Sequence, residues 1–260
     1  MKRFQLHNLR AGPTKIPRAC ELHCDGVARH VEPPDVVTQH LSNELVVGVD
    51  VDTHNWGTNV GSNGGIGQYG FYTRCNSNIG RCHIVRLGWA ISGSNAPTVT
   101  KERLVKPECY IISEKAEQHH GISNKVATQQ GRDIRDVMEE FMDDMMTLYA
   151  RGWRVVIHHL ELDAGIISQE LIRADMNNSK TEWESIARRG VCTMCPVLGR
   201  WVRQCLNIEI SPNMSLNTMR LDIMLKHLAP DGTVSRSAGS DAEKHVILYF
   251  ALQRLAKESE

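Results

Sequence analysis

The chain of 260 residues is 41% hydrophobic, which is enough for one substantial core and predicts a single domain. Its 30 basic and 30 acidic residues balance to a formal net charge of zero. This balance argues against a chromatin-like or polybasic binder, because any basic channel for nucleic acid has to be formed locally by folding. No apolar run reaches the length of a signal peptide or a membrane span, so we expect no membrane association.

The cysteines and the first residues bear on the compartment. Eight cysteines are spread unevenly and accompany no secretory signal, so we expect a reducing, intracellular compartment, cytoplasmic or nuclear. The first twenty residues carry five basic side chains and no acidic one. This composition faintly resembles an organellar transit sequence, although the segment is poor in serine.

The N-terminal third predicts an arm followed by three strands. Residues 1–43 mix four prolines with scattered charge, which predicts an irregular arm ahead of a folded domain over 44–260. The domain opens with ELVVGVD, a β-branched apolar run typical of a buried strand. Residues 84–91 (IVRLGWAI) and 98–107 (TVTKERLVKP) predict two further strands. No long helix separates the three strands, so we expect a meander.

A long loop rich in glycine and asparagine is predicted over about residues 57–80. Loops of this length inside compact domains are usually functional or disordered. Tyr69, Phe71 and Tyr72 are interleaved with small residues in this loop. Two interpretations are open: the rings stack on nucleic-acid bases, or they pack the loop onto the domain.

The second half of the chain is predicted to be mainly helical. Residues 133–150 carry apolar side chains at helical spacing, and WRVVIHH (153–159) follows as a buried strand. Further helices are predicted over 165–174, 197–206, 216–228 and 242–255. Strands and helices in this order favour an α/β domain with a mixed sheet.

Three acidic clusters follow one another along the chain: Asp50 with Asp52 in VVGVDVDTH, Asp163 in HHLELDAGI and Asp241 in RSAGSDAEKH. Asp50 and Asp52 close the first strand, so at a period of two residues both carboxylates point to one face. A single aspartate is most often an exposed carboxylate, but four in this order favour a shared metal site. Hard oxygen ligands select Mg²⁺ or Mn²⁺ over zinc.

With these acids, the segments LGWAI, VKPECYIISEKAEQHHGIS and AGSDAE give the chain, over about residues 44–255, a specific resemblance to a known family. It resembles the DnaQ-like 3′→5′ exonucleases of the DEDDh type, in the ribonuclease H-like superfamily. The resemblance implies a mixed five-stranded sheet with an antiparallel second strand and helices on both faces. It also implies that Asp50, Asp52, Asp163 and Asp241 hold two Mg²⁺ or Mn²⁺ ions, and that the partner is the 3′ end of single-stranded RNA or DNA.

The resemblance extends to the HHGI segment. His120, Gly121 and Ile122 are similar to the family's wedge against the terminal nucleotide, in which Ile122 would pack on the base and Gly121 would let the backbone approach closely. An ordinary helix C-cap with its hydrophobic contact also explains Gly-Ile after a short helix.

Two positions depart from the family pattern. Asp52 stands where the family has glutamate, so its carboxylate is one methylene shorter. Arg236 stands where the family has its general-base histidine, five residues before Asp241. Arginine does not accept a proton near neutral pH, although its guanidinium can clamp a phosphate. The first departure puts metal binding in doubt and the second puts the base in doubt.

Several histidines are candidates for the missing base. His245 follows Asp241 by four residues on the predicted last helix and thus lies on nearly the same face. His54 follows the first acidic pair, and His159 stands where the family often has asparagine, so both are also candidate substrate contacts. A metal-activated water can react without a dedicated base, at a cost of roughly two to four orders of magnitude in rate.

Three functional hypotheses follow from these observations. The first is a metal-dependent 3′→5′ exonuclease on single-stranded RNA or DNA, which is slow if the base is absent. The second is a degenerate relative that binds nucleic-acid ends without efficient cleavage. The third is a scaffold whose glycine-rich loop and N-terminal arm contact a protein partner.

The spacing of Cys192 and Cys195 in CTMC suits a zinc site, and Cys20 with Cys24, or Cys75 with Cys82, would supply a second pair. These second pairs lack the regular spacing of a zinc ribbon or finger. We therefore favour buried thiols over structural zinc.

Overall fold

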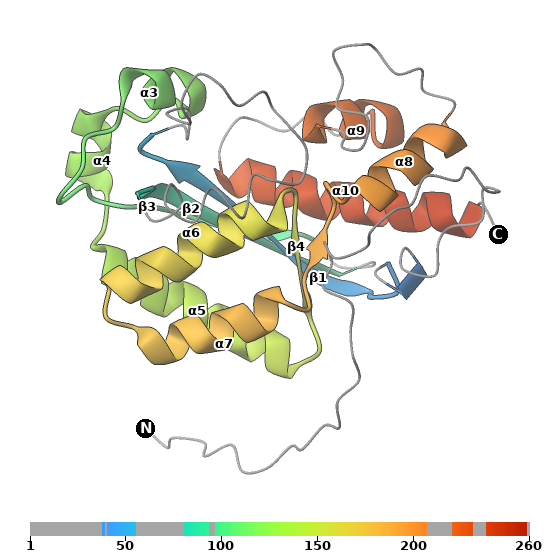
Figure 1. The fold of residues 1–260 in the computed structure, drawn as a ribbon, viewed down its shortest axis with the longest axis horizontal. Coiled ribbons are helices and arrows are strands. Elements are labelled where there is room, and N and C mark those ends of the chain that lie inside the picture. The colour runs from blue at the N-terminus through green and yellow to red at the C-terminus, as the bar shows by residue number, and fades with distance from the viewer. Residues whose placement is uncertain are drawn as a thin grey trace.

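The computed structural model describes residues 38–39, 41–55, 81–93, 97–206, 220–230 and 238–258. Within them the chain forms a mixed five-stranded sheet in the order β3-β2-β1-β4-β5 (Figure 1). The strands are β1 (Leu45–Thr53), β2 (Ile84–Gly93), β3 (Val99–Leu104), β4 (Arg154–Ile157) and β5 (Val191–Cys192). β2 is antiparallel to both β1 and β3, whereas β4 is parallel to β1 and to β5. The predicted five-stranded sheet with an antiparallel second strand is confirmed.

Helices cover both faces of the sheet (Figure 1). In the described part of the chain they are α3 (Glu114–His120), α4 (Asn124–Gln130), α5 (Ile134–Ala150), α6 (Leu160–Arg173), α7 (Asn177–Ala187), α8 (Pro196–Cys205), α9 (Leu221–Leu228) and α10 (Ala238–Glu258). α5 matches the prediction, because Asp133 caps its N-terminus and its apolar side chains face the core at helical spacing. α6 begins before the predicted Gly165, so Asp163 lies in its first turn. The sequence did not predict β5 or α7.

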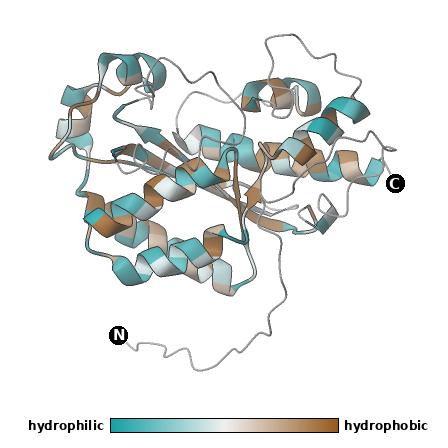
Figure 2. Ribbon diagram, in the orientation of Figure 1, coloured by the Kyte–Doolittle hydropathy of each residue, from teal (hydrophilic) through white to brown (hydrophobic). Residues whose placement is uncertain are grey.

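The alternation of side chains along β1 divides the core into two layers. Val47 and Val49 pack with α5, α6 and α7 on one face, and Val46 packs with α8, α9 and α10 on the other. In Figure 2 the helices carry hydrophobic residues beside hydrophilic ones. Val46, Asp50 and Asp52 are spaced by even numbers of residues along β1, so their side chains share one face of the sheet. This is the face that α10 covers.

Gly48 allows α10 to lie directly on β1. A Cβ built on Gly48 would lie 2.0 Å from the carbonyl oxygen of Ala242, which no real Cβ tolerates. The backbone of α10 therefore packs on the strand without an intervening side chain. This close approach brings the first turns of α10 to the end of β1, where the aspartates lie.

Part of the predicted N-terminal arm packs on the domain. Leu41 is 3% exposed and belongs to the core on the α10 side. The backbone N–H of Asn43 donates to the Tyr249 hydroxyl at 3.1 Å, and that hydroxyl donates to the Asn43 carbonyl at 3.0 Å. Residues 1–37 and the predicted loop over 57–80 lie outside the described residues. Among the helices that are described, none has the length and apolarity to cross a bilayer.

Gly48→Ala is expected to destabilise the protein by about 3 kcal/mol or more, because the added methyl group collides with backbone that cannot rotate away. Urea unfolding followed by circular dichroism measures the loss. Gly152→Ala is the control: Gly152 has a φ of +83° with open space around it, so that variant should lose only about 1–2 kcal/mol through backbone strain. Equal losses of stability in the two variants would show that α10 can shift to accommodate the added methyl group.

Candidate functional site

The four predicted aspartates influence one another electrostatically at the ends of three elements. Asp50 and Asp52 end β1, Asp163 lies in the first turn of α6, and Asp241 lies in the first turn of α10. Burial raises the pKa of Asp50 well above its ordinary value, and the charges of Asp163, Asp52 and Asp241 raise it further. Burial also raises the pKa of Asp163, and the charge of Asp52 adds to that rise. The fold therefore places these carboxylates near one another.

Sheet topology explains why the acids meet. β1 and β4 are adjacent and parallel, so their carboxyl ends lie at one edge of the sheet. α6 begins three residues after β4 and carries Asp163 to this edge. Asp163 is only 6% exposed, so the site buries a carboxylate that would otherwise be hydrated.

Asp52 forms an ion pair with Arg86, a residue that the sequence reasoning did not single out. Nε of Arg86 donates to Oδ2 of Asp52 at 2.8 Å, and Nη2 lies 2.6 Å from the same oxygen. The two residues are direct partners in the antiparallel register of β1 and β2, and Arg86 is 7% exposed. Burial raises the pKa of Asp52, and Arg86 opposes this rise. A lone arginine inside the apolar run IVRLGWAI was the available signal.

Arg86 also connects the acids to the start of α10. Its Nη1 lies 3.6 Å from Oε1 of Glu102 on β3. Oε2 of Glu102 accepts a hydrogen bond of 2.8 Å from the backbone N–H of Gly239. A chain of polar contacts thus runs from Asp52 through Arg86 and Glu102 to the first turn of α10, two residues before Asp241.

Asp241 is paired within its own helix. Nζ of Lys244, three residues later, forms a short ion pair with Oδ1 of Asp241. Asp241 is more accessible than Asp163, since 38% of its side chain is exposed. Arg236, at the predicted base position, lies outside the described residues.

His245 lies beside Asp50, inside the core. Its Nδ1 lies 3.0 Å from the carbonyl oxygen of Val49 and its Nε2 lies 3.9 Å from Oδ1 of Asp50. A carbonyl only accepts, so Nδ1 carries the proton and Nε2 presents its lone pair toward Asp50. Burial lowers the pKa of His245 to about 4, which keeps the ring neutral near neutral pH. Among the histidines considered as bases, His245 has the contact with an aspartate, although it is only 1% exposed.

The HHGI segment forms a helix cap. Gly121 ends α3 with a φ of 75°, and its N–H donates to the Glu117 carbonyl. Ile122 is 4% exposed and packs with Val85 and Ile112. Because its side chain is already covered, Ile122 does not present the exposed surface expected of a wedge. His120 is also buried; its Nδ1 accepts from the Ile122 N–H at 3.1 Å, and burial lowers its pKa while the charge of Asp52 opposes that shift.

His54 joins the end of β1 to the start of β2. Its Nδ1 accepts from the His83 N–H at 3.0 Å, and its ring centroid lies 5.0 Å from that of Tyr110. This contact uses one ring nitrogen for structure. His159 precedes α6 in a left-handed conformation with a φ of 91°, which is strained for a residue with a side chain. Burial lowers the pKa of His159 to about 4.

The CTMC cysteines lie on the other side of β4. Cys192 ends β5 and Cys195 is the N-cap residue of α8. Burial raises the pKa of Cys192 to about 11, so its thiol stays protonated near neutral pH, whereas metals bind the thiolate. Cys20, Cys24 and Cys75 lie outside the described residues.

The carboxylates fit a divalent cation in charge and ligand type, but they are not arranged as a ready-made cage. Among the residues that the structure describes, no three side chains of histidine, cysteine, aspartate or glutamate form a group that could hold a metal ion. Two of the four carboxylates, those of Asp52 and Asp241, are instead paired with side-chain cations. Asp163, which is buried, and Asp50, which is partly buried, remain as acids whose raised pKa values a bound cation would lower.

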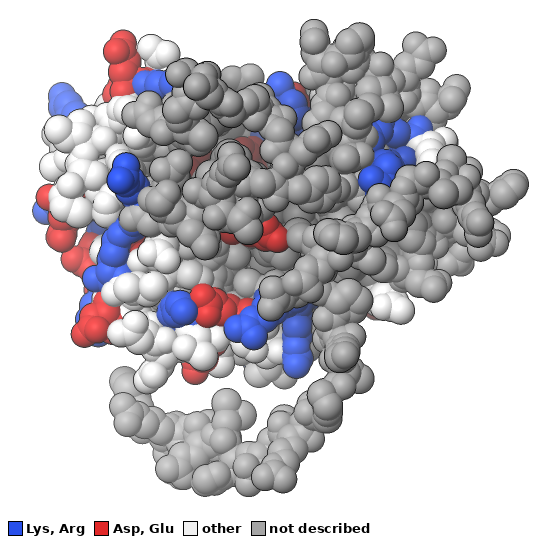
Figure 3. Space-filling view, in the orientation of Figure 1, with Lys and Arg blue, Asp and Glu red and all other residues white. Residues whose placement is uncertain are grey.

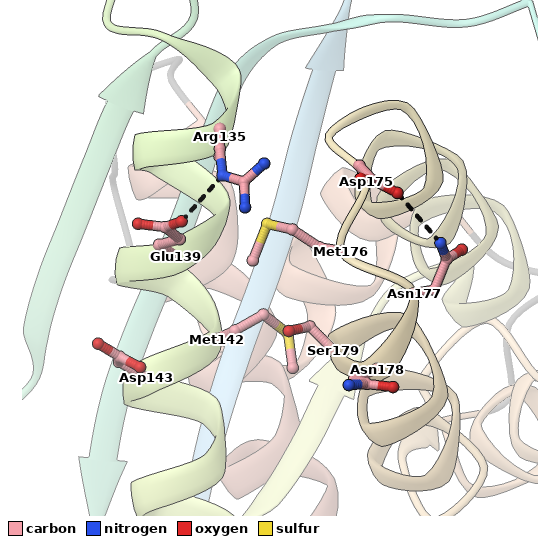
Figure 4. Close-up of a pocket in the computed structure, with 9 residues that line it drawn as sticks. All are labelled: Arg135, Glu139, Met142, Asp143, Asp175, Met176, Asn177, Asn178 and Ser179. Carbon is pink, nitrogen blue, oxygen red and sulfur yellow. Dashed lines mark hydrogen bonds and ion pairs between the residues drawn. The ribbon is translucent and has the colours of Figure 1, made fainter.

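A separate groove of about 580 Å³ lies between α5 and α7 (Figure 4). Its lining includes Arg135, Glu139, Met142 and Asp175, and none of the four predicted aspartates. On the face shown in Figure 3, basic and acidic side chains both occur on the described surface. Neither feature marks a second site for an acidic ligand.

Comparisons with known proteins find similarity in structure alone. No protein-family model and no curated protein sequence matches the chain. Exonuclease I of E. coli in complex with a dA16 oligonucleotide aligns with a TM-score of 0.59 and 11% identity, over 83% of this chain and 43% of that one. The zinc-bound form of an E. coli exonuclease I complex with single-stranded DNA gives 0.55 and 13%, over 83% and 41%.

A moderately thermophilic exonuclease I from Methylocaldum szegediense aligns with a TM-score of 0.56 and 13% identity, over 82% of this chain and 44% of that one. The chain thus spans less than half the length of these exonucleases. At such identities the likeness establishes a shared fold. The mixed sheet flanked by helices is the ribonuclease H-like fold of these exonucleases, as the sequence predicted.

Asp163→Asn is expected to stabilise the metal-free protein by on the order of 1–3 kcal/mol, because the variant removes a charge that is disfavoured by burial and repelled by Asp52. The folded-state pKa of Asp163 is raised above 3.8, so its contribution to stability is present at low pH and is lost as the pH rises through the folded-state pKa. The gain should therefore appear near neutral pH and vanish near pH 4.

Urea unfolding in EDTA at several pH values measures this gain. The control is Asp143→Asn, since Asp143 is exposed on α5, and it should change stability by less than about 0.5 kcal/mol. A loss of stability in Asp163→Asn near neutral pH would mean that the carboxylate makes favourable contacts that outweigh the repulsion.

Proposed function

We propose that the protein is a metal-dependent 3′→5′ exonuclease that acts on single-stranded RNA or DNA. The observation that carries the proposal is the pair of Asp50 and Asp163 at the strand ends of a ribonuclease H-like sheet. Asp163 is 6% exposed, the side chain of Asp50 is 19% exposed, and the pKa values of both are raised. Burial of two mutually repelling carboxylates costs stability, and such a cost is typical of a functional site. The oligonucleotide complexes formed by exonuclease I support single-stranded nucleic acid as the partner.

Different residues of the chain would bind the metal, accept a proton and bind the phosphate. Asp50 and Asp163 would hold Mg²⁺ or Mn²⁺, and Asp52 and Asp241 stand at the positions where the resemblance implies further metal ligands. Bound metal would supply an activated water and stabilise the departing 3′-oxygen. His245 holds a neutral Nε2 toward Asp50, so it is placed to accept a proton on that side of the carboxylates. Arg236 would bind the phosphate, because its charge is permanent.

The proposal predicts that a 5′-labelled single strand is shortened stepwise from its 3′ end in Mg²⁺ or Mn²⁺. Asp163→Asn should lower the rate by about 10³-fold or more, since a buried ligand charge is lost. The assay uses parallel RNA and DNA strands and a strand blocked at its 3′ end. The matched control is Asp143→Asn, which should cut at the wild-type rate. A folded wild-type protein that leaves every strand intact in both metals would refute the proposal.

A second candidate function is binding of nucleic-acid ends without efficient cleavage. The ion pairs of Asp52 with Arg86 and of Asp241 with Lys244 favour it, because they engage two of the four proposed ligands. Arg236 at the base position favours it as well.

This second candidate predicts oligonucleotide binding, measured by fluorescence anisotropy, without turnover. If only the base is missing, Arg236→His should raise the cleavage rate by about 10²-fold or more. An unchanged rate with unchanged binding would show that the metal ligands, and not the base, limit the reaction.

A further inference from the structure

The charges buried at the carboxylate site do not balance among themselves. Asp52 is paired with Arg86, and Asp241 is paired with Lys244. Among the described residues, no lysine or arginine forms an ion pair with Asp50 or Asp163, and His245 approaches Asp50 only to 3.9 Å. Arg86 is shared between Asp52 and Glu102, so the described cations offset only part of the negative charge of these acids. Within the described residues Asp50 and Asp163 have no cationic side chain of their own, and a divalent ion bound to them would supply the missing positive charge.

Arg86 is built into the site more firmly than a surface ion-pair partner would be. It is 7% exposed and lies opposite Asp52 in the strand register, and two of its nitrogens contact the same oxygen of Asp52. Its third nitrogen faces Glu102, which in turn accepts from Gly239. Removing a cation that is fixed on both sides leaves buried charge uncompensated.

The position of Arg86 also matters for a second metal ion. The guanidinium lies 2.6 Å from Asp52, on the face of β1 that also carries Asp50. Any cation added near Asp52 would be repelled by this guanidinium at short range, in surroundings where charges are weakly screened. The guanidinium thus supplies locally part of the charge that a second metal ion would bring.

We propose that Arg86 is a resident cation of this site and a positioning residue for Asp52, so that the chain binds one divalent ion, through Asp50 and Asp163, instead of two. The inference rests on the proposed function, because it concerns the same carboxylates. It also assigns Lys244 a parallel role toward Asp241, on the more exposed side of the site.

The experiment counts bound Mn²⁺ on the full chain without nucleic acid, at about pH 7.5. Isothermal titration calorimetry and the electron paramagnetic resonance signal of free Mn²⁺ give the stoichiometry. Wild type should bind one ion per chain. Arg86→Gln should bind a second ion, with an affinity on the order of tenfold or more above that of wild type for any second ion, because one positive charge is removed. Arg86→Lys, which keeps the charge, should bind one.

Two further variants separate this role from a merely structural one. Arg103→Gln removes a cation of β3 that pairs with Glu140 of α5, outside the site, and this variant should still bind one ion. Lys244→Gln removes the other resident cation, whose side chain is 16% exposed, and should also gain a second ion. It provides the test if Arg86→Gln fails to fold.

Two ions bound to wild type would overturn the inference, and so would an unchanged stoichiometry in folded Arg86→Gln and Lys244→Gln. If wild type binds two ions and shortens the labelled strand, the inference fails while the proposed function stands. If wild type binds no Mn²⁺ and leaves the strand intact, both fail.

Discussion

Repulsion among buried carboxylates is the constraint on which the rest of this structure depends. The charge of Asp163 raises the pKa of Asp50, and the charge of Asp52 raises the pKa of Asp163, a repulsion that a fold selected for stability alone would avoid. The surrounding residues limit the cost. Arg86 holds Asp52, Lys244 holds Asp241, and the neutral ring of His245 contacts the backbone without adding charge.

The packing of helix α10 on the sheet sets the positions of two residues of the site. Its backbone lies on Gly48, its apolar side chains form the core with Val46, and its first turns carry Asp241 and His245. Glu102 fixes the start of the same helix through Gly239. The position of two site residues is therefore set by the contact that also builds one half of the core, so the site and the fold depend on each other.

The likeness to exonuclease I persists at 11–13% identity, which shows how little of the sequence the ribonuclease H-like sheet requires. What the sheet provides is an edge where strand ends and helix starts meet. One fold supports different chemistries, so function depends on the side chains at that edge. Here they combine largely buried aspartates with arginine and lysine side chains that pair with two of them.

The sequence by itself determined the α/β class and the central strands, because side-chain alternation along β1 and helical spacing along α5 are local patterns. The five-stranded topology was implied by the family resemblance that the ordered acids and their flanking segments carry. Tertiary structure decided what local patterns do not encode. β5 has only two residues, and α6 begins at Leu160, because packing fixes these boundaries. Strand register paired Asp52 with Arg86, and folding covered Ile122. Contacts between residues distant in sequence depend on three-dimensional placement, so the charge balance of the site emerged only with the fold.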